Sequence, residues 1–295
     1  MRRFDLDAAG RTLVLGERPL LMGIVNASPD SFSDGGDHPD LEARVEHARK
    51  LLAAGADLLD VGGESAITQR PPIDAGDEIA RVVPLVRRLA DELGAVVSVD
   101  TYKPSVARAA IAAGAVIVND VSGLRDPELA DVCAATGAAL VLMHTRAAPK
   151  QRLQDAGLYE DVAADVASFL SERLELALER GVREEQLVLD PGPDFSKTPA
   201  QTIAVLRSLE ELHALGRPLL LAVSRKDFIG AITGRRPAAR LAGTLAALAH
   251  GVDAGAHILR VHDVAEAADF LAVRAALRGD SGFDGALALG DAIRH

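Results

Sequence analysis

The sequence contains very few cysteine and aromatic residues. Its 295 residues include a single cysteine, Cys133, and no tryptophan, and aromatic side chains make up 3% of the chain. One cysteine excludes an internal disulfide framework and fits a reducing compartment, so we expect a cytoplasmic protein. Apolar residues still account for 48% of the chain, which suffices for a large core built from Ala, Val and Leu.

Long hydrophobic runs and an excess of positive charge are missing as well. Charges or glycines interrupt every apolar stretch, so we expect neither a membrane span nor, at residues 1–7, a signal peptide. The formal net charge of −11 argues against a general nucleic-acid or membrane-surface binder, because both need a positive face. A small anionic substrate is compatible with this charge if positive side chains gather locally.

A joint between a helix and a strand recurs along the chain. At each joint an apolar helical stretch ends at a glycine, and a short β-prone run follows at once. The glycines are Gly55, Gly94, Gly114, Gly137, Gly181, Gly216 and Gly255. Because glycine readily adopts the left-handed conformation just past a helix, each joint predicts a helix end followed by a strand.

The runs after these joints are apolar on both faces, as strands of a parallel sheet covered by helices should be. Together with the first apolar run they predict strands at 20–25, 58–61, 96–100, 116–118, 140–143, 187–189, 219–223 and 258–261. Regular alternation of strand and helix predicts right-handed parallel crossovers. Eight units favour a closed (β/α)₈ barrel, the TIM-barrel class of α/β folds, and an open doubly wound sheet is the structural alternative.

The barrel is expected to form a single domain with two short additions. Residues 1–18 are polar, contain Gly10 and Gly16, and predict a hairpin that plugs the barrel bottom. The barrel itself is expected to span 19–277, a length typical of this fold. Residues 278–295 are rich in glycine and aspartate and predict a C-terminal tail.

Polar or glycine-rich segments follow all of the expected strands. They are Asn26, Gly62-Gly63-Glu64, Asp100, Asn119-Asp120, His144-Thr145-Arg146, Asp190, Ser224-Arg225-Lys226 and Arg260-Val261-His262. In (β/α)₈ barrels the active site lies at the carboxyl ends of the strands. Polar residues at all of these ends therefore predict a functional site at the barrel mouth.

Two aspartates and an asparagine at these ends suit a ligand with adjacent N–H donors. A carboxylate can accept two such hydrogen bonds side by side, and Asp100 and Asp190 are expected to face one another with Asn119 between them. The plainer alternative is that each aspartate caps the helix that follows it. Asn119 is the stronger binding candidate, because an unpaired amide at a buried strand end is costly.

Arg260 and His262 are separated by one residue on the last expected strand. Strand alternation directs both side chains to the barrel mouth, where a pair of cations would hold a diphosphate. The alternative is that His262 caps the last helix. No cluster of His, Cys and carboxylate residues has metal-ligand spacing, so we expect any metal to be held loosely and largely by substrate phosphates.

These strings resemble the dihydropteroate synthase family. Residues 26–36 are similar to the first loop of that family, and further similar strings occur in family order at 60–65, 100–102, 119–123, 190–192, 224–230 and 260–264. The resemblance runs from about residue 19 to residue 275. It implies a pterin-binding homodimer, a transferase of folate biosynthesis that joins 6-hydroxymethyl-7,8-dihydropterin diphosphate to p-aminobenzoate and releases diphosphate.

The resemblance also implies a role for individual side chains. It assigns the pterin to Asp100, Asn119, Asp190 and Lys226, the diphosphate to Asn26, Arg70, Arg260 and His262, Mg²⁺ to Asn26, and the acceptor side to Phe32, Thr68 and Asp227. The implied catalytic residues are Arg260 and His262, which stabilise the departing charge, and Asp100, which helps the pterin ring to carry positive charge.

The sequence departs from the family mainly on the acceptor side. The second loop carries a short insertion, in which Arg70 is the expected anion-binding arginine and Thr68 the equivalent of the family's threonine. Asp227 stands where the family commonly has serine or a basic residue near the acceptor carboxylate. Two carboxylates there would repel one another unless Asp227 is protonated or paired. In addition, Asp194 and Ser196 replace two customary glycines.

Three functions are therefore compared. The synthase is the first. The altered second loop and Asp227 motivate the second, a paralogue that uses another acceptor or binds pterins without turning them over. The third, a methyltetrahydrofolate:corrinoid methyltransferase, has no diphosphate to hold, and the basic residues at the strand ends argue against it. Outside these assignments, Lys197 and Arg225 are as compatible with a solvated or salt-bridged position as with a catalytic one.

Overall fold

The computed structural model describes residues 1–27, 37–64 and 71–279, with the backbone alone at 37–40. Within them, eight parallel strands form one sheet in the order β8-β7-β6-β5-β4-β3-β10-β9. The strands are β3 (Leu20–Asn26), β4 (Leu58–Gly62), β5 (Val97–Asp100), β6 (Ile117–Asp120), β7 (Ala139–Met143), β8 (Leu187–Asp190), β9 (Leu220–Leu221) and β10 (Ile258–Val261).

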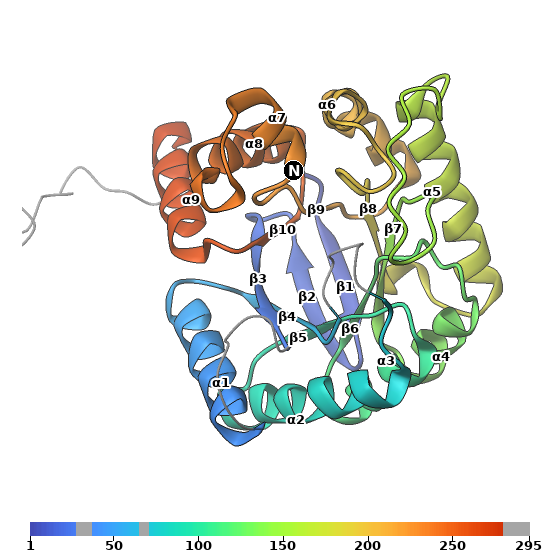
Figure 1. The fold of residues 1–295 in the computed structure, drawn as a ribbon, viewed down its shortest axis with the longest axis vertical. Helices are drawn as coiled ribbons and strands as arrows, with labels where there is room; N and C mark the ends of the chain where they lie inside the picture. Colours follow the sequence, from blue (N-terminus) through green and yellow to red (C-terminus); the bar gives the residue numbers. More distant parts are fainter. Residues whose placement is uncertain (28–36, 65–70, 280–295) are drawn as a thin grey trace, which may run out of the picture.

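Helices surround this sheet (Figure 1). They are α1 (Asp37–Ala53), α2 (Ala75–Leu93), α3 (Pro104–Ala112), α4 (Glu128–Thr136), α5 (Val162–Glu179), α6 (Pro199–Arg207), α7 (Asp227–Thr233), α8 (Leu241–Asp253) and α9 (Val264–Arg278), with short 3₁₀ turns η2 (Glu184–Gln186), η3 (Leu209–Leu215) and η4 (Pro237–Ala239). Helix α9 ends where the predicted tail begins, and residues 280–295 of that tail lie outside the described residues.

The sheet closes into a barrel between its two end strands. Leu189 at the end of β8 bridges to Leu219 in parallel orientation, and the Leu189 N–H donates to the Pro218 carbonyl over 2.9 Å. The predicted (β/α)₈ barrel is confirmed, because an open sheet would leave these two strands apart. Strand β9 is shorter than the expected 219–223, since its regular pairing with β10 covers only two residues.

The helix-ending glycines explain why the sequence forms these units. All seven predicted joints have a positive φ, between 61° and 113°. Helix α2 shows the complete pattern: the Asp74 carboxylate caps its start by accepting from the Asp77 N–H, and Gly94 ends it in the left-handed conformation. The strand β5 then follows after only two residues.

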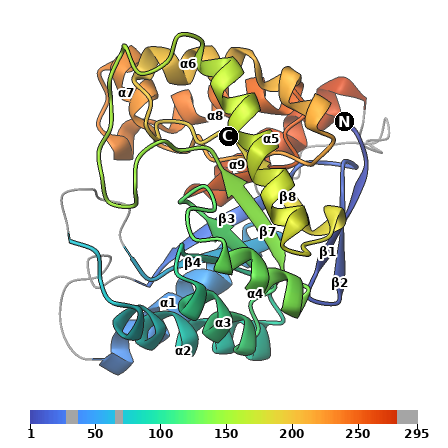
Figure 2. The same ribbon diagram turned by 90° about the vertical axis from the view of Figure 1, so that its right-hand side faces the viewer.

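The predicted hairpin is present and fills the lower end of the barrel. Its strands β1 (Phe4–Ala8) and β2 (Arg11–Leu15) pair antiparallel, and Leu6 and Leu15 pack in one buried cluster with residues from inside the barrel. Figure 2 shows this hairpin at the end opposite to the long connection between β7 and α5. The polar strand ends therefore occupy the other, open end.

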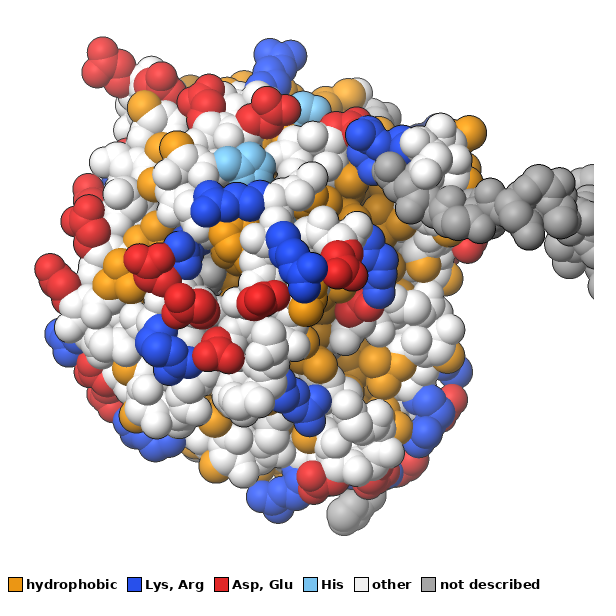
Figure 3. Space-filling model, turned by 180° about the vertical axis from the view of Figure 1, so that it is seen from behind, with side chains coloured by type: hydrophobic (Ala, Val, Ile, Leu, Met, Phe, Trp, Pro, Cys, Tyr) orange, Lys and Arg blue, Asp and Glu red, His pale blue; other side chains and the backbone are white. Residues whose placement is uncertain are grey.

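The surface seen from behind carries charges of both signs. Lys and Arg side chains are interspersed with Asp and Glu across this face (Figure 3). Among the described residues, no helix has the length and apolar character required to span a bilayer.

Candidate active site

A cleft of about 790 Å³ opens at the carboxyl ends of the strands. The sequence-predicted residues that line it are Asn26, Asp100, Asn119, Asp190, Lys226, Asp227, Arg260 and His262. The barrel therefore brings together side chains that are far apart in the sequence. The predicted residues Phe32, Thr68 and Arg70 lie outside the described residues.

Arg260 makes two ion pairs at the floor of the cleft. Its Nε donates to Oδ2 of Asp60 over 2.6 Å, and its Nη2 donates to Oδ2 of Asp100 over 2.8 Å. The guanidinium thus joins β10 to β4 and β5 inside the barrel. Sequence reasoning did not single out Asp60, although a charged residue inside an otherwise apolar strand is a signal that could have found it.

Asp60 also fixes the orientation of Asn119. Its Oδ2 accepts a hydrogen bond from Nδ2 of Asn119 over 3.1 Å, so the carbonyl oxygen Oδ1 is the atom that Asn119 can offer to a ligand. This Oδ1 and Oδ1 of Asp60 are buried without a hydrogen-bond partner among the described residues. Because buried acceptors are normally satisfied, the floor of the cleft is suited to a ligand that donates hydrogen bonds.

The two aspartates at the strand ends do not cap helices. The residue at the start of α3 is Lys103 rather than Asp100, and Thr198 caps α6. Oδ1 of Asp190 instead accepts from the Gly192 N–H over 2.7 Å. The capping alternative is therefore wrong for both aspartates.

The depth of the cleft changes the protonation of its carboxylates. Burial raises the pKa of Asp100 to about 7, although the neighbouring Arg260 opposes the shift. Burial likewise raises the pKa of Asp190, against the hydrogen bond from Gly192. Asp100 consequently changes charge close to neutral pH.

The two members of the expected cation pair at the end of β10 differ in their charge. Burial, with smaller effects of Arg225 and Arg260, lowers the pKa of His262 to about 4, so this imidazole is neutral at pH 7. Its Nδ1 lies 3.0 Å from Oγ of Ser224, whereas the N-cap residue of α9 is Asp263, and no side chain caps that helix. The helix-capping alternative for His262 is therefore wrong as well.

The contacts of Ser224 are compatible with one hydrogen-donating tautomer of His262. Oγ of Ser224 accepts from the His262 N–H over 3.2 Å, so its hydroxyl hydrogen can donate to Nδ1. In this arrangement Nε2 carries the ring hydrogen. A neutral His262 can then donate a hydrogen bond from Nε2.

Asp227 is paired with a positive side chain, and a paired Asp227 would not repel the carboxylate of the acceptor. Its Oδ1 accepts from Nη1 of Arg240 over 3.0 Å, and its side chain is 65% exposed. The same Arg240 nitrogen donates to the Arg225 carbonyl over 2.9 Å. Asp227 therefore lines the cleft as one member of an ion pair.

Three neighbouring side chains have clear structural surroundings. Lys226 places its Nζ 4.3 Å from the centre of the Phe195 ring, and burial lowers the pKa of Lys226 against the opposing effect of Asp194. Phe228 is buried in the hydrophobic core. Arg225 forms an ion pair with Asp263, which matches its salt-bridged alternative.

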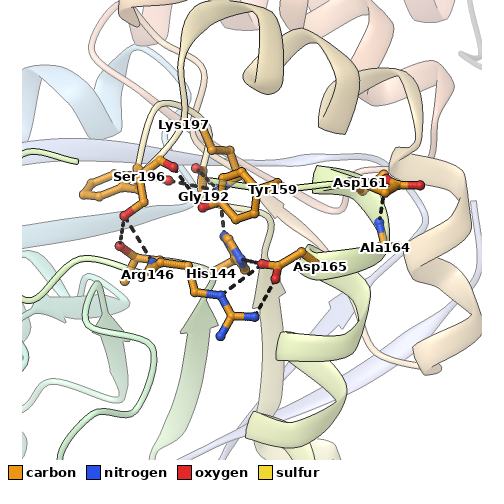
Figure 4. A network of polar contacts seen from close by, with 12 residues as sticks. His144, Arg146, Tyr159, Asp161, Ala164, Asp165, Gly192, Ser196 and Lys197 are labelled. Atoms are coloured by element: carbon orange, nitrogen blue, oxygen red, sulfur yellow. Dashed lines mark hydrogen bonds and ion pairs between the residues drawn. The ribbon is translucent and has the colours of Figure 1, made fainter. Parts of the chain in front are cut away.

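Lys197 is not solvated, and it has no ion-pair partner among the described residues. Its side chain is fully buried, and Figure 4 shows it directed at His144 and the Gly192 backbone behind the cleft wall. Its Nζ lies 2.7 Å from Nδ1 of His144.

A second group of charges borders the cleft near the end of β4. Nζ of Lys103 contacts Glu64 over 2.8 Å and Glu78 over 2.5 Å. The Tyr102 hydroxyl donates to Glu64 over 3.0 Å. Sequence reasoning missed this group, because its members come from two different units of the barrel, β4–α2 and β5–α3.

Comparisons with known proteins identify the family of this chain. A family model described as "Pterin binding enzyme" matches residues 22–262. The dihydropteroate synthase of Bacillus subtilis (strain 168) is 43% identical over 253 residues, which cover 85% of this chain and 86% of that protein. The chain therefore belongs to the pterin-binding enzyme family, and within it to the dihydropteroate synthases, which are transferases.

Solved structures give the same result. The dihydropteroate synthase of Xanthomonas albilineans with 4-aminobenzoic acid superposes with a TM-score of 0.87 at 45% identity, covering 94% of this chain and 99% of that one. The same enzyme in complex with 7,8-dihydropteroate gives a TM-score of 0.83 at 44% identity, again covering 94% and 99%.

Removing the Asp60 carboxylate should destabilise the barrel. We expect Asp60→Ala to lower the free energy of unfolding by about 2–4 kcal/mol, because the variant leaves Arg260 with one carboxylate and the Asn119 amide unpaired. Urea unfolding measures the change. Asp131→Ala, which removes an exposed ion pair with Arg180, is the matched control and should have little effect. Equal losses in the two variants would contradict the assigned role of Asp60.

Proposed function

We propose that this chain condenses 6-hydroxymethyl-7,8-dihydropterin diphosphate with p-aminobenzoate and releases diphosphate. The observation that carries the proposal is the set of buried acceptors at the floor of the cleft, where Asn119 offers Oδ1 between the carboxylates of Asp100 and Asp190. A pterin has a planar edge of N–H donors that matches such acceptors. The relatives that bind 4-aminobenzoic acid and 7,8-dihydropteroate support the same reaction.

The pterin would be bound by Asp100, Asn119, Asp190 and Lys226. Asp100 and Asp190 each use one carboxylate oxygen within the protein, toward Arg260 and Gly192, so the second oxygen can accept from the ligand. Lys226 would donate to the acceptor side of the ring. The network around Asp60 supports this mode of binding, because it orients Asn119 and Arg260 before the ligand arrives.

The diphosphate would contact Arg260, His262, Asn26 and Arg70. Arg260 supplies the positive charge, and His262 supplies an N–H donor at Nε2. A bound diphosphate would favour the imidazolium and so raise the pKa of His262 from about 4. Both groups would stabilise the charge that grows on the leaving oxygen.

Asn26 fits a loosely held Mg²⁺. It ends β3 with an exposed side chain that lines the cleft, and its carboxamide oxygen is a ligand type that Mg²⁺ accepts. Within the described ranges, no group of three or more His, Cys, Asp or Glu residues could hold a metal. Asn26 would therefore share the ion with the diphosphate oxygens, and the ion would neutralise part of the leaving group's charge.

The reaction is a displacement at carbon. The arylamine nitrogen forms a bond to the methylene carbon, the carbon–oxygen bond breaks, and its electron pair leaves with diphosphate. The nitrogen then releases one proton to solvent, which gives the neutral amine of the product. Ionised Asp100 would stabilise positive charge on the pterin ring during this step. Asp100, Arg260 and His262 are thus the proposed catalytic residues, and none of them needs to form a covalent bond to the substrate.

The acceptor side is compatible with p-aminobenzoate. Because Asp227 is paired with Arg240, the acceptor carboxylate would not meet an unpaired charge there, and one of the two reasons for a non-synthase paralogue is removed. Phe32 and Thr68 are proposed to complete this side. By the same family resemblance, we propose that the enzyme acts as a homodimer in the cytoplasm.

The decisive assay incubates the protein with the dihydropterin diphosphate, Mg²⁺ and p-aminobenzoate. We expect dihydropteroate and diphosphate in equal amounts. Diphosphate without dihydropteroate would indicate another acceptor. Pterin binding with neither product would indicate a paralogue without synthase activity, and turnover of methyltetrahydrofolate alone would favour the methyltransferase.

The pH dependence of the reaction tests Asp100. Its ionised form predominates above its pKa of about 7, so kcat, which reports the chemical step, should rise with pH through this value. Asp100→Asn should lower kcat by about 10²-fold or more and abolish the rise. Steady-state kinetics between pH 5.5 and about 8 measure both effects. An unchanged rise in Asp100→Asn would assign the titration to another group.

We expect Arg240 to affect the binding of p-aminobenzoate only through its ion pair with Asp227. We expect Arg240→Ala to raise the KM for p-aminobenzoate about three- to tenfold, because it exposes an unpaired carboxylate to the acceptor. Asp227→Ser and the double variant should stay within about twofold of the parent protein. If the double variant is as impaired as Arg240→Ala, the pairing does not explain the effect.

A further inference from the structure

The connection after β8 has an unfavourable backbone conformation. Within residues 191–197, Gly192 has a φ of 63°, Asp194 a φ of 65° and Ser196 a φ of 52°. Side chains other than glycine are strained in this left-handed region and persist there only where the surroundings hold them. This connection, here called the β8 loop (residues 191–197), must therefore be held by specific contacts.

The ammonium group of Lys197 contacts two backbone carbonyl oxygens of the β8 loop. Its Nζ lies 2.9 Å from the Gly192 carbonyl oxygen and 3.1 Å from the Phe195 carbonyl oxygen. The third contact is Nδ1 of His144, at 2.7 Å. An ammonium group has three N–H donors, and in this fully buried position each of them has one acceptor (Figure 4).

His144 is fixed as the acceptor in this contact. Its Nε2 lies 2.9 Å from Oδ1 of Asp165, and that carboxylate also accepts from Nε and Nη2 of Arg146. Nε2 must therefore carry the hydrogen, which leaves the lone pair on Nδ1 facing Lys197. Burial lowers the pKa of His144 to about 3, so the ring is neutral.

The β8 loop holds one side chain of the cleft and contributes another to its wall. The Gly192 N–H holds Oδ1 of Asp190, and the Phe195 ring lies under Nζ of Lys226. Ser196 accepts at its Oγ from the Ala147 N–H over 2.8 Å and so joins the loop to the segment after β7. A displacement of the β8 loop would therefore move both Asp190 and the wall formed by Phe195.

We propose that Lys197 is a positioning residue, whose buried ammonium group holds the β8 loop so that Asp190 and Phe195 face the substrates in a fixed geometry. The inference rests on the proposed function for the identity of the substrates. Lys197 is not among the residues that line the cleft in the described part of the chain, so it acts through the β8 loop rather than by touching substrate.

The positioning should depend on pH. Burial lowers the pKa of Lys197 to about 7. The charged groups that act on it are Asp165 on α5, Asp190 at the end of β8, Asp194 in the β8 loop and Lys226 just before α7, and His144 after β7 contacts it directly. An uncharged amine has only two N–H donors for three acceptors, so substrate binding should weaken as the pH rises above about 7.

The test compares Lys197→Met, which keeps the length of the side chain, with Lys50→Met at an exposed lysine. We expect Lys197→Met to raise the KM for the dihydropterin diphosphate and for p-aminobenzoate about tenfold, with a smaller change in kcat. The reason is that the variant loses the buried hydrogen bonds from a charged group to the β8 loop. It should also lose the weakening of binding above pH 7. Lys50→Met should match the parent protein. An unchanged KM and pH dependence in Lys197→Met would overturn the proposal.

A second pair of variants covers the case in which Lys197→Met does not fold. His144→Leu removes the acceptor for Lys197, whereas the amide oxygen of His144→Asn can replace Nδ1. His144→Leu should raise both KM values, and His144→Asn should restore them at least in part. Equal KM values in the two variants would overturn the proposal.

Calorimetry with 6-hydroxymethyl-7,8-dihydropterin separates this inference from the proposed function. If the parent protein binds this pterin but forms no dihydropteroate, the proposed reaction fails, and the role of Lys197 is still measured. About tenfold weaker pterin binding in Lys197→Met, with unchanged binding in Lys50→Met, supports the positioning role. Equal dissociation constants contradict it.

Discussion

The ion pairs of Arg260 with Asp60 and Asp100 are the interaction on which the site depends. A guanidinium inside a barrel is expensive to desolvate and is tolerated only where carboxylates and hydrogen bonds surround it. Here the two carboxylates come from neighbouring strands β4 and β5, and one of them also orients Asn119. The charge that stabilises a leaving diphosphate and the acceptors that select a pterin are therefore parts of one network.

Sequence patterns predicted the fold and the polar strand-end residues of the cleft for physical reasons. Glycine is favoured in the left-handed position just past a helix, and strands covered on both faces are apolar, so the barrel units are encoded locally. The parallel arrangement then places all strand ends at one mouth, which brought Asp100, Asn119, Asp190 and Arg260 together. Such features depend on residues close in the sequence or on the topology of the fold.

The remaining features depend on partners that no local pattern identifies. Asp227 starts α7 and pairs with Arg240, which follows that helix in the sequence. Lys197 lies after β8 and contacts His144, which follows β7. The neutral state of His262 follows from burial, which a sequence does not display. For the same reason the sequence left open whether Asp227 is paired and whether Lys197 is solvated, salt-bridged or catalytic, whereas the structure shows the partners of both.

The hairpin at the barrel bottom has a consequence for the order in which the protein folds. The carbonyl of Arg2 accepts a hydrogen bond from Nε2 of His257, over 2.9 Å and across 255 positions of the sequence, and Leu6 and Ile258 belong to the same buried cluster. Contacts between residues so far apart in the sequence form slowly, because a long loop must close before they can be made. Docking of the hairpin beneath the barrel is therefore expected to be a late step of folding.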